Sequence, residues 1–236
     1  MNLVTITQAM FMLGFVSMAA ATFYFVMQRN DYKPEHRATI SYAAVITFIA
    51  AVMYWQMKDI VGFPMQGSAA QIAATMPVRY LDWVLTTPLL LIEFGIVASL
   101  AGAAKGITYR LIVADIVMIV TGYFGEVGTP GSPSNYVNFI ISSAAWLYIV
   151  YLIWNLQLGK SSEDLKKVVT NMKYFVIFGW AIYPIGTAIQ QFMVVGNSDT
   201  DTQNNAVCVA AIIYVIADVV NKVGFGLVAM KALKKN

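Results

Sequence analysis

The chain has 236 residues, of which 59% are hydrophobic and only 11% are charged. Soluble domains carry about 25% charged residues, so this composition excludes an ordinary soluble enzyme, a disordered chain and a nucleic-acid-binding protein. One cysteine, Cys208, allows neither an internal disulfide nor a cysteine metal site, and one histidine, His36, argues against histidine-based catalysis. The composition predicts an integral membrane protein that is not an enzyme and holds no metal.

Seven apolar runs are each long enough to form a membrane helix, which needs about 20 residues. Uniformly apolar runs favour helices over the alternating strands of a membrane barrel. We therefore expect an all-α membrane protein with one seven-helix domain over residues 1–236. The seven runs are residues 3–27, 38–57, 78–103, 107–126, 136–157, 170–194 and 206–230.

The breaks between these runs are polar or rich in glycine and proline. Residues 58–76 form the longest break, which has room for a small hairpin or a capping loop. Pro77 suits the first turn of the third helix, where a missing N–H costs nothing. Pro88 and Pro184 lie inside runs and are expected to kink the third and sixth helices.

The basic residues indicate an orientation. Twelve of the 15 Lys and Arg residues lie after the first, third and fifth runs or at the C-terminus, against Lys58 alone on the opposite side. The positive-inside rule then places the N-terminus outside and the C-terminus in the cytoplasm. The twelve are Arg29, Lys33, Arg37, Lys105, Arg110, Lys160, Lys166, Lys167, Lys173, Lys231, Lys234 and Lys235.

Six charged residues stand out within the apolar runs, where an ionisable group is costly and indicates a functional site. Any one of them could be a polar group satisfied within a bundle, but six together make that explanation weak. Asp82 and Glu93 share a helix face and lie three turns, about 16 Å, apart. The six are Arg79, Asp82, Glu93, Asp115, Asp218 and Lys222.

Lys222 lies in the middle of the seventh run, one helical turn from Asp218. A buried lysine is a good amine nucleophile and can form a Schiff base with an aldehyde. The alternative is a plain ion pair between Lys222 and Asp218. Trp83 lies in the third run, and Trp180 and Tyr183 share a face of the sixth. Such aromatics usually pack a core, but beside a reactive lysine they indicate a long apolar chromophore.

Three segments carry a resemblance to the microbial rhodopsins, and two more are similar to proteorhodopsins in particular. The motifs DxxxT in the third run, WxxYP in the sixth and DxxxK in the seventh are a specific combination, and the likeness covers nearly the whole chain. The segments are RYLDWVLTTPLLLIE (79–93), GWAIYPIG (179–186), ADVVNKVGFGL (217–227), GYFGEVG (122–128) and FIISSAAWLYIVY (139–151).

The resemblance implies a light-driven outward proton pump with all-trans retinal bound to Lys222 as a protonated Schiff base. It makes Asp82 the counterion and proton acceptor, Asp218 the second counterion, and Glu93 the cytoplasmic proton donor, which its apolar surroundings would keep neutral. Arg79 would stabilise both aspartates, with Thr86 intact beside Asp82 and with Tyr54, Tyr80 and Tyr183 hydrogen-bonded around them. The remaining residues expected in the retinal pocket are Trp83, Leu90, Met118, Gly122, Trp146, Trp180 and Pro184.

The sequence also departs from the proteorhodopsin pattern. The expected helix-B histidine is replaced by Met53, and His36 is expected to be a solvated loop residue. Thr187 replaces an aromatic residue and leaves room at the ring end of retinal, and Phe139 replaces the glycine of relatives that bind an antenna carotenoid. Leu90 matches the residue that accompanies green absorption.

Two further acids have open roles. Asp115 is expected to be protonated, hydrogen-bonded and structural. Glu126 belongs either to a proton exit network or to the cap of a turn.

Two other functions remain as alternatives. One is a slow-cycling photosensor, against which Glu93 counts because sensors of the family usually lack a donor carboxylate. The other is a pump for a different ion, which the intact pair of Asp82 and Thr86 disfavours. The resemblance further implies a multi-pass protein of the bacterial inner membrane, with the lipid bilayer and the transported proton as partners and a homo-oligomeric state.

Overall fold

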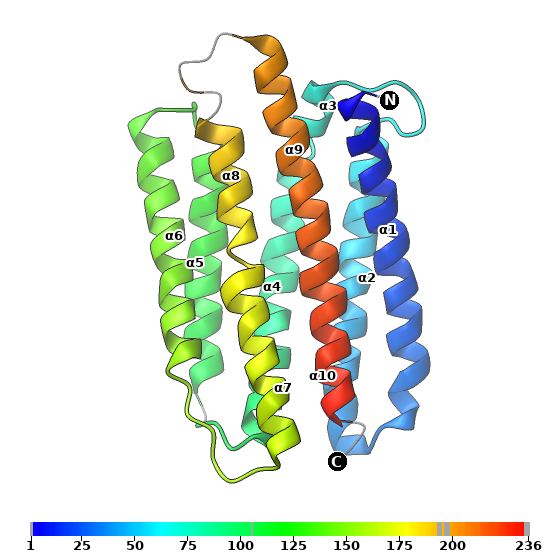
Figure 1. Cartoon of the computed structure of the whole chain (residues 1–236), viewed down its shortest axis with the longest axis vertical. Coiled ribbons are helices and arrows are strands. Elements are labelled where there is room, and N and C mark those ends of the chain that lie inside the picture. The colour runs from blue at the N-terminus through cyan, green and yellow to red at the C-terminus, as the bar shows by residue number, and fades with distance from the viewer. Residues whose placement is uncertain (1, 105, 193–194, 196–198, 234–236) are drawn as a thin grey trace.

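The computed structural model describes residues 2–104, 106–192, 195 and 199–233. The helices of this part of the chain lie side by side and form a bundle (Figure 1). Seven helical stretches within it are long and apolar enough to cross a membrane, which confirms the expected number of spans. The spans are Leu3–Asp31, Pro34–Ile60, Ala69–Leu100, Ile107–Val127, Pro133–Trp154, Glu163–Gln191 and Thr200–Lys231.

The first five spans are built mainly from single long helices, whereas the sixth and seventh are each divided by a short π-helical segment. The elements of the first five are α1 (Leu3–Gln28), η1 (Arg29–Asp31), η2 (Pro34–His36), α2 (Arg37–Ile60), α3 (Ala69–Ala73), α4 (Met76–Leu100), α5 (Ile107–Val127) and α6 (Pro133–Trp154). Those of the last two are α7 (Glu163–Tyr174), η3 (Phe175–Gly179), α8 (Ile182–Phe192), α9 (Thr200–Asp218), η4 (Val219–Gly224) and α10 (Phe225–Leu233).

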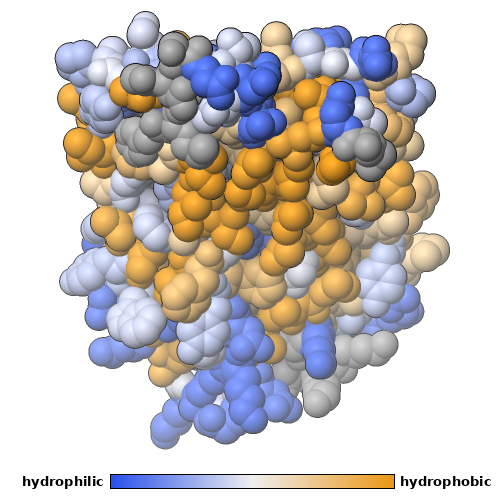
Figure 2. Space-filling model, turned by 45° about the horizontal axis from the view of Figure 1, so that its top comes forward, coloured by the Kyte–Doolittle hydropathy of each residue, from blue (hydrophilic) through white to orange (hydrophobic). Residues whose placement is uncertain are grey.

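The two chain ends lie at opposite ends of the bundle (Figure 1). We call them the N-end, at the top of Figure 1, and the C-end. Figure 2 shows orange hydrophobic side chains between two hydrophilic ends, as expected for a surface in contact with lipid. Large apolar side chains on this surface are exposed, among them Phe23, Phe48, Phe124 and Phe178. A soluble bundle would bury such residues, so the exposed belt supports a membrane environment.

Local hydrogen bonds explain where several helices begin. The Asn2 side chain accepts from Thr5 N at the start of α1, and Ser132 and Ser162 cap α6 and α7 in the same manner. Pro77 lies in the first turn of α4, as expected. Such caps satisfy N–H groups that have no partner inside the helix.

Three boundaries differ from the sequence expectation. Residues 58–76 contain the short helix α3, held by a reciprocal cap between Ser68 and Gln71, and no hairpin among the described residues. The sixth and seventh helices begin at Glu163 and Thr200, several residues before their apolar runs. Polar residues can continue a helix into water, so hydropathy alone marks the lipid-embedded part and misses the extension.

His36 is not the solvated loop residue that the sequence suggested. It is only 6% exposed, and its Nδ1 lies 3.3 Å from the backbone oxygen of Leu233 in α10. The short connection between α1 and α2 folds back under the last helix at the C-end, which buries the imidazole. This correction comes from a contact between residues that are far apart in the sequence.

The core differs between the two ends of the bundle. At the C-end, one continuous apolar cluster draws on α1, α2, α4, α5, α6, α7 and α10, with Leu91, Phe94 and Val97 fully buried at its centre. At the N-end, the buried apolar residues divide into two smaller clusters, one around Tyr54 and one around Tyr214. Polar side chains occupy the space between these two clusters.

Candidate functional site

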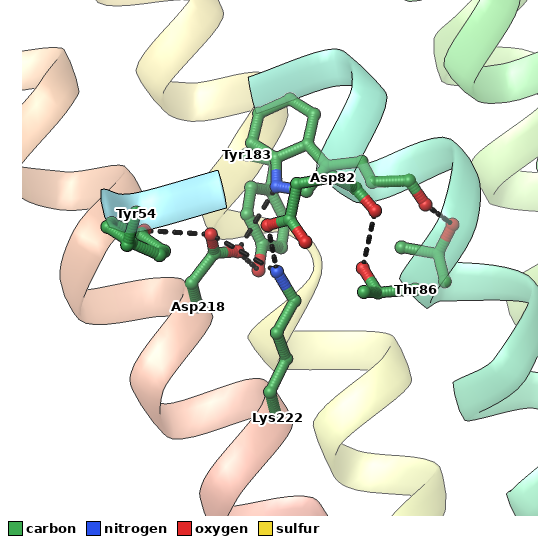
Figure 3. A network of polar contacts seen from close by, with 8 residues as sticks. Tyr54, Asp82, Thr86, Tyr183, Asp218 and Lys222 are labelled. Atoms are coloured by element: carbon green, nitrogen blue, oxygen red, sulfur yellow. Dashed lines mark hydrogen bonds and ion pairs between the residues drawn. The ribbon is translucent and has the colours of Figure 1, made fainter. Parts of the chain in front are cut away.

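The central feature of the site is Lys222, a buried cation between two buried carboxylates. Its Nζ lies 2.5 Å from Oδ2 of Asp82 and 3.3 Å from Oδ2 of Asp218, and all three side chains are at most 1% exposed. Figure 3 shows Asp82 and Asp218 converging on the end of Lys222 from different helices. A buried ammonium group is tolerated only with such compensation. The ion pair between Lys222 and Asp218, which the sequence offered as the alternative to a Schiff base, is present, and Asp82 of α4 adds a second acid to it.

The two aspartates have different surroundings. Asp218 accepts three hydrogen bonds: from Tyr54 Oη at 2.8 Å, from Tyr183 Oη at 2.8 Å and from Trp83 Nε1 at 3.1 Å. Asp82 has only Lys222 on Oδ2, and its Oδ1 is buried with no hydrogen-bond partner among the described residues. Hydrogen bonds to a carboxylate favour its charged form. Asp218 is therefore the more fully hydrogen-bonded carboxylate of the two, and Asp82 is the acid with an oxygen that lacks a partner among the described residues.

Thr86 supports the backbone next to Asp82 rather than its carboxylate. Its hydroxyl donates to the backbone oxygen of Asp82 at 2.8 Å, as Figure 3 shows. Threonine commonly bonds in this way to the carbonyl four residues earlier in a helix. The pair of Asp82 and Thr86 is thus close in space, as the sequence predicted, through a main-chain contact.

Arg79 does not directly contact either aspartate in the described structure, although it was expected to stabilise both. Its Nη2 donates to Thr75 Oγ1 at 3.1 Å, and its guanidinium carbon lies 4.6 Å from the centre of the Tyr214 ring. The guanidinium therefore lies toward the N-end, stacked on an aromatic face. Sequence spacing places Arg79 on the correct helix face but cannot show in which direction a long side chain extends.

Tyr80 was also expected around the aspartates, but among the described residues it forms no hydrogen bond with them. Its ring packs edge to face on Trp83 and on Tyr123, at 5.0 and 5.4 Å between centres. Its hydroxyl lies beside Gly122 in α5. Tyr80 also lines a cavity between α4, α5, α6 and α8.

A cavity with a mainly apolar and aromatic lining lies between α4, α5, α6 and α8, as is typical of a small-molecule site. The expected pocket residues that line it are Trp83, Met118, Gly122, Trp146, Trp180, Tyr183 and Pro184. Trp83 and Tyr183 also bind Asp218, so the cavity begins at the Lys222 site. Leu90 and Tyr54 do not line it: Leu90 lies in the C-end apolar cluster, and Tyr54 contacts Asp218 from the other side.

The mainly apolar lining of the cavity fits an apolar ligand that extends from the Lys222 site. A Cβ on Gly122 would come within 3.1 Å of Ser142 Oγ and 3.2 Å of Tyr80 Oη, so glycine lets these two side chains approach α5 closely. The sequence missed several polar residues in the lining. These are Thr87, Glu126, Asn135, Ser142, Ser143 and Gln191.

Glu93 lies on the C-end side of Lys222, apart from the hydrogen-bonded network. It is fully buried, and both carboxylate oxygens lack a hydrogen-bond partner among the described residues. Its neighbours along α4 belong to the C-end apolar cluster. An isolated carboxyl in apolar surroundings is disfavoured in its charged form.

Asp115 accepts a hydrogen bond from Thr87 Oγ1 at 2.9 Å, across α4 and α5, so the hydrogen bond expected from sequence is confirmed. Its side chain is fully buried. It therefore joins α4 and α5 and stands apart from the ion pairs of Lys222 in the described part of the chain.

Glu126 occupies the N-end side of the site and does not cap a turn. It is 6% exposed, and its Oε1 accepts from the Tyr214 hydroxyl at 3.3 Å. The helix end itself is closed by Gly128 N, which donates to Gly125 O. Since Arg79 stacks on the same Tyr214 ring, these three side chains form one group on the N-end side of the aspartates.

Comparison with known proteins identifies the family. Residues 5–236 match the family described as Bacteriorhodopsin-like protein. Green-light absorbing proteorhodopsin of Gamma-proteobacterium EBAC31A08 is 32% identical over 228 residues, which cover 94% of this chain and 84% of that protein. Proteins named sensory rhodopsin-2 are also relatives, at 35% and 30% identity.

Two solved structures extend the comparison. The crystal structure of Exiguobacterium sibiricum rhodopsin has a TM-score of 0.85 and 37% identity, covering 99% of this chain and 98% of that chain. The structure of xanthorhodopsin, described as a light-driven ion pump with dual chromophore, has a TM-score of 0.81 and 25% identity, covering 99% of this chain and 94% of that chain.

The family consists of photoreceptors and ion pumps rather than enzymes, and its members bind retinal through a lysine Schiff base. Buried Lys222 in the seventh span, with carboxylates beside it, is consistent with that chemistry. The chain is thus a multi-pass membrane protein, and it belongs to the family of bacteriorhodopsin-like proteins, the microbial rhodopsins.

Proposed function

We propose that this microbial rhodopsin is a light-driven outward proton pump. The observation that carries the proposal is the placement of two different buried acids on either side of Lys222. Asp82 contacts Lys222 and keeps one free oxygen, and Glu93 lies about three helical turns away toward the C-end. A pump needs one group that accepts a proton and another that returns one from the opposite side.

Lys222 would hold all-trans retinal covalently, and the aromatic walls of the cavity would enclose its chain. Bound as a protonated Schiff base, retinal would supply the light-absorbing, proton-carrying group of the site. Asp82 would accept the proton, because its Oδ1 is free while Asp218 is already saturated with donors. Asp218 would remain the permanent counterion that keeps a cation tolerable at this depth.

The remaining buried groups suit a direction of transport. Glu126, linked to Arg79 through Tyr214, would continue the route from Asp82 toward the N-end. Glu93 would return a proton from the C-end. With Asp82 as acceptor and Glu93 as donor, each turnover moves one proton from the C-end to the N-end.

The orientation in the membrane is part of the proposal. Most basic residues lie at the C-end connections, so the positive-inside rule makes the C-end cytoplasmic and the transport outward. Three of the counted residues, Lys105, Lys234 and Lys235, lie outside the described part of the chain. We further propose one domain over residues 1–236, location in a bacterial inner membrane, and the homo-oligomer that the family suggests.

The test is light-driven pH change in bacterial cells that express the protein and receive added retinal. Illumination should acidify an unbuffered medium, and a protonophore should abolish the signal. Cells with Lys222→Ala should give neither colour nor pH change, because they lack the covalent attachment point. A coloured wild-type protein that changes no external pH would overturn the pump.

Two other functions predict different results. Relatives named sensory rhodopsin keep the photosensor as an alternative, and a photocycle lasting seconds that Glu93→Gln leaves unchanged would favour it. A pump for another ion would lose its signal in salt free of sodium or chloride, whereas proton transport would persist.

A further inference from the structure

The sixth and seventh spans are joined at their two π-helical segments, η3 and η4. Each segment contains a glycine that receives a side chain of the other. The Asn221 amide of η4 lies against Gly179 of η3, so close that a Cβ on Gly179 would collide with Asn221 Oδ1. The Phe175 ring of η3 lies against Gly224 of η4, where a Cβ would be 3.1 Å from the ring.

The Asn221 contact is also a hydrogen bond to the backbone. Asn221 is 1% exposed, and its Nδ2 donates to the backbone oxygen of Gly179 at 3.0 Å. Asn221 and Lys222 are consecutive residues, and both are buried within η4. In a regular helix successive side chains point about 100° apart, so a π-helical turn helps both face the bundle interior.

The need for this bond follows from Pro184. In an α-helix, Gly179 O would accept from Tyr183 N, and Trp180 O from the next residue. That residue is Pro184, which has no N–H. Tyr183 N instead donates to Trp180 O at 3.2 Å, which leaves Gly179 O without its helical donor. The Asn221 side chain supplies the missing donor from the neighbouring span.

Two residues that follow Gly179 belong to the candidate site. Trp180 lines the cavity, and Tyr183 both lines it and donates to Asp218. Whatever fixes the backbone of residues 179–183 therefore fixes these two side chains relative to the seventh span.

We propose that Asn221 is a positioning residue. Its amide donates to the backbone carbonyl of Gly179, which lacks a helical donor because of Pro184, and so holds Trp180 and Tyr183 in place against the Lys222 segment. Its expected effect on retinal rests on the function proposed above, whereas its effect on the helices does not.

The primary experiment is hydrogen–deuterium exchange of the retinal-free protein in lipid nanodiscs, compared for wild type and Asn221→Leu. Leucine keeps roughly the same size and removes the donor. We expect the amides of residues 180–183 and 185 to exchange about tenfold faster or more, because a buried carbonyl loses its partner. The matched control is Asn138→Leu, which removes another bond from an asparagine Nδ2 to a helix carbonyl, Ser134 O at 2.9 Å. The proposal would be overturned if these amides exchanged within twofold of wild type in Asn221→Leu. It would also be overturned if Asn138→Leu accelerated them equally.

A second variant tests the same contact from the opposite side and covers a folding failure of the first. Gly179→Ala should displace the Asn221 amide and accelerate the same amides, whereas Gly224→Ala meets only a ring edge and should do so less. After addition of retinal, the Asn221 and Gly179 variants should share a shifted absorption maximum, which a uniform loss of stability would not produce. Because the exchange measurement needs neither retinal nor light, a protein that proves not to pump leaves its outcome unaffected.

Discussion

The two halves of the bundle, on either side of Lys222, are built differently. The N-end half is polar inside: Asp218 receives three donors, and Arg79 and Glu126 meet at Tyr214. The C-end half is filled by one continuous apolar cluster, and its buried acid, Glu93, has no hydrogen-bond partner among the described residues.

For the proposed pump, this difference predicts that a proton leaves the site toward the N-end more easily than it enters from the C-end. On the N-end side, Arg79, Tyr214 and Glu126 form a polar group beyond the aspartates. On the C-end side, a charge would have to cross packed side chains such as Leu91 and Phe94, which carry no group able to hold it. Proton return through Glu93 then requires water or a rearrangement of the C-end half, and we expect it to be the slower event.

The largest expected effect comes from Asp82→Asn, which removes the proposed acceptor. Light-driven pH change in cells should fall to roughly a hundredth of wild type or less, since a positioned proton-transfer group contributes 10²-fold or more. Pyranine or a pH electrode measures the loss. Retention of most of the signal would show that the proton leaves by another group.

The next effect separates the two halves directly. Glu93→Gln should slow the return of the initial absorbance after a flash by about tenfold or more, because a neutral amide cannot donate the proton. A small membrane-permeant weak acid should restore the rate by carrying protons past the apolar cluster.

The matched substitution in the N-end half is Glu126→Gln. Since Arg79 and Tyr214 remain, recovery after the flash should stay within about threefold of wild type. Equal slowing by the two variants would contradict the proposed difference between the halves.

The smallest effect is expected for Asp115→Asn. An amide oxygen can still accept from Thr87, so the free energy of unfolding should change by about 1 kcal/mol or less. Thermal unfolding of the purified protein measures the change, and pumping should be unaffected. Loss of pumping would mean that Asp115 takes part in proton transfer.

The sequence predicted the fold and the centre of the site well because charge is rare in a membrane chain. Seven apolar runs became seven spans, and the i, i+4 pair of Asp218 and Lys222 appears together with Asp82 as a three-residue cluster. Helical periodicity fixes such relations, since residues three or four positions apart share a face.

The remaining features depend on contacts that local patterns do not encode. His36 is buried because a distant helix end covers it, and Arg79 extends toward Tyr214 although its position on α4 also suits the aspartates. The π-helical segments have weak sequence signals. Pro184 predicted a kink in the sixth helix. The donor that satisfies the freed carbonyl of Gly179 is Asn221, which comes from another span.

The polar beginning of α9 gives this molecule a built-in place for a reporter. The helix starts at Thr200, where the Asp199 side chain accepts from Thr202 N at 3.0 Å, and exposed Asn204 follows within the same helix. A spin label at Asn204 would share a helix with Lys222, roughly 27 Å away along the axis. Rotation or tilt of the seventh span could then be recorded from the aqueous side without any alteration of the buried site.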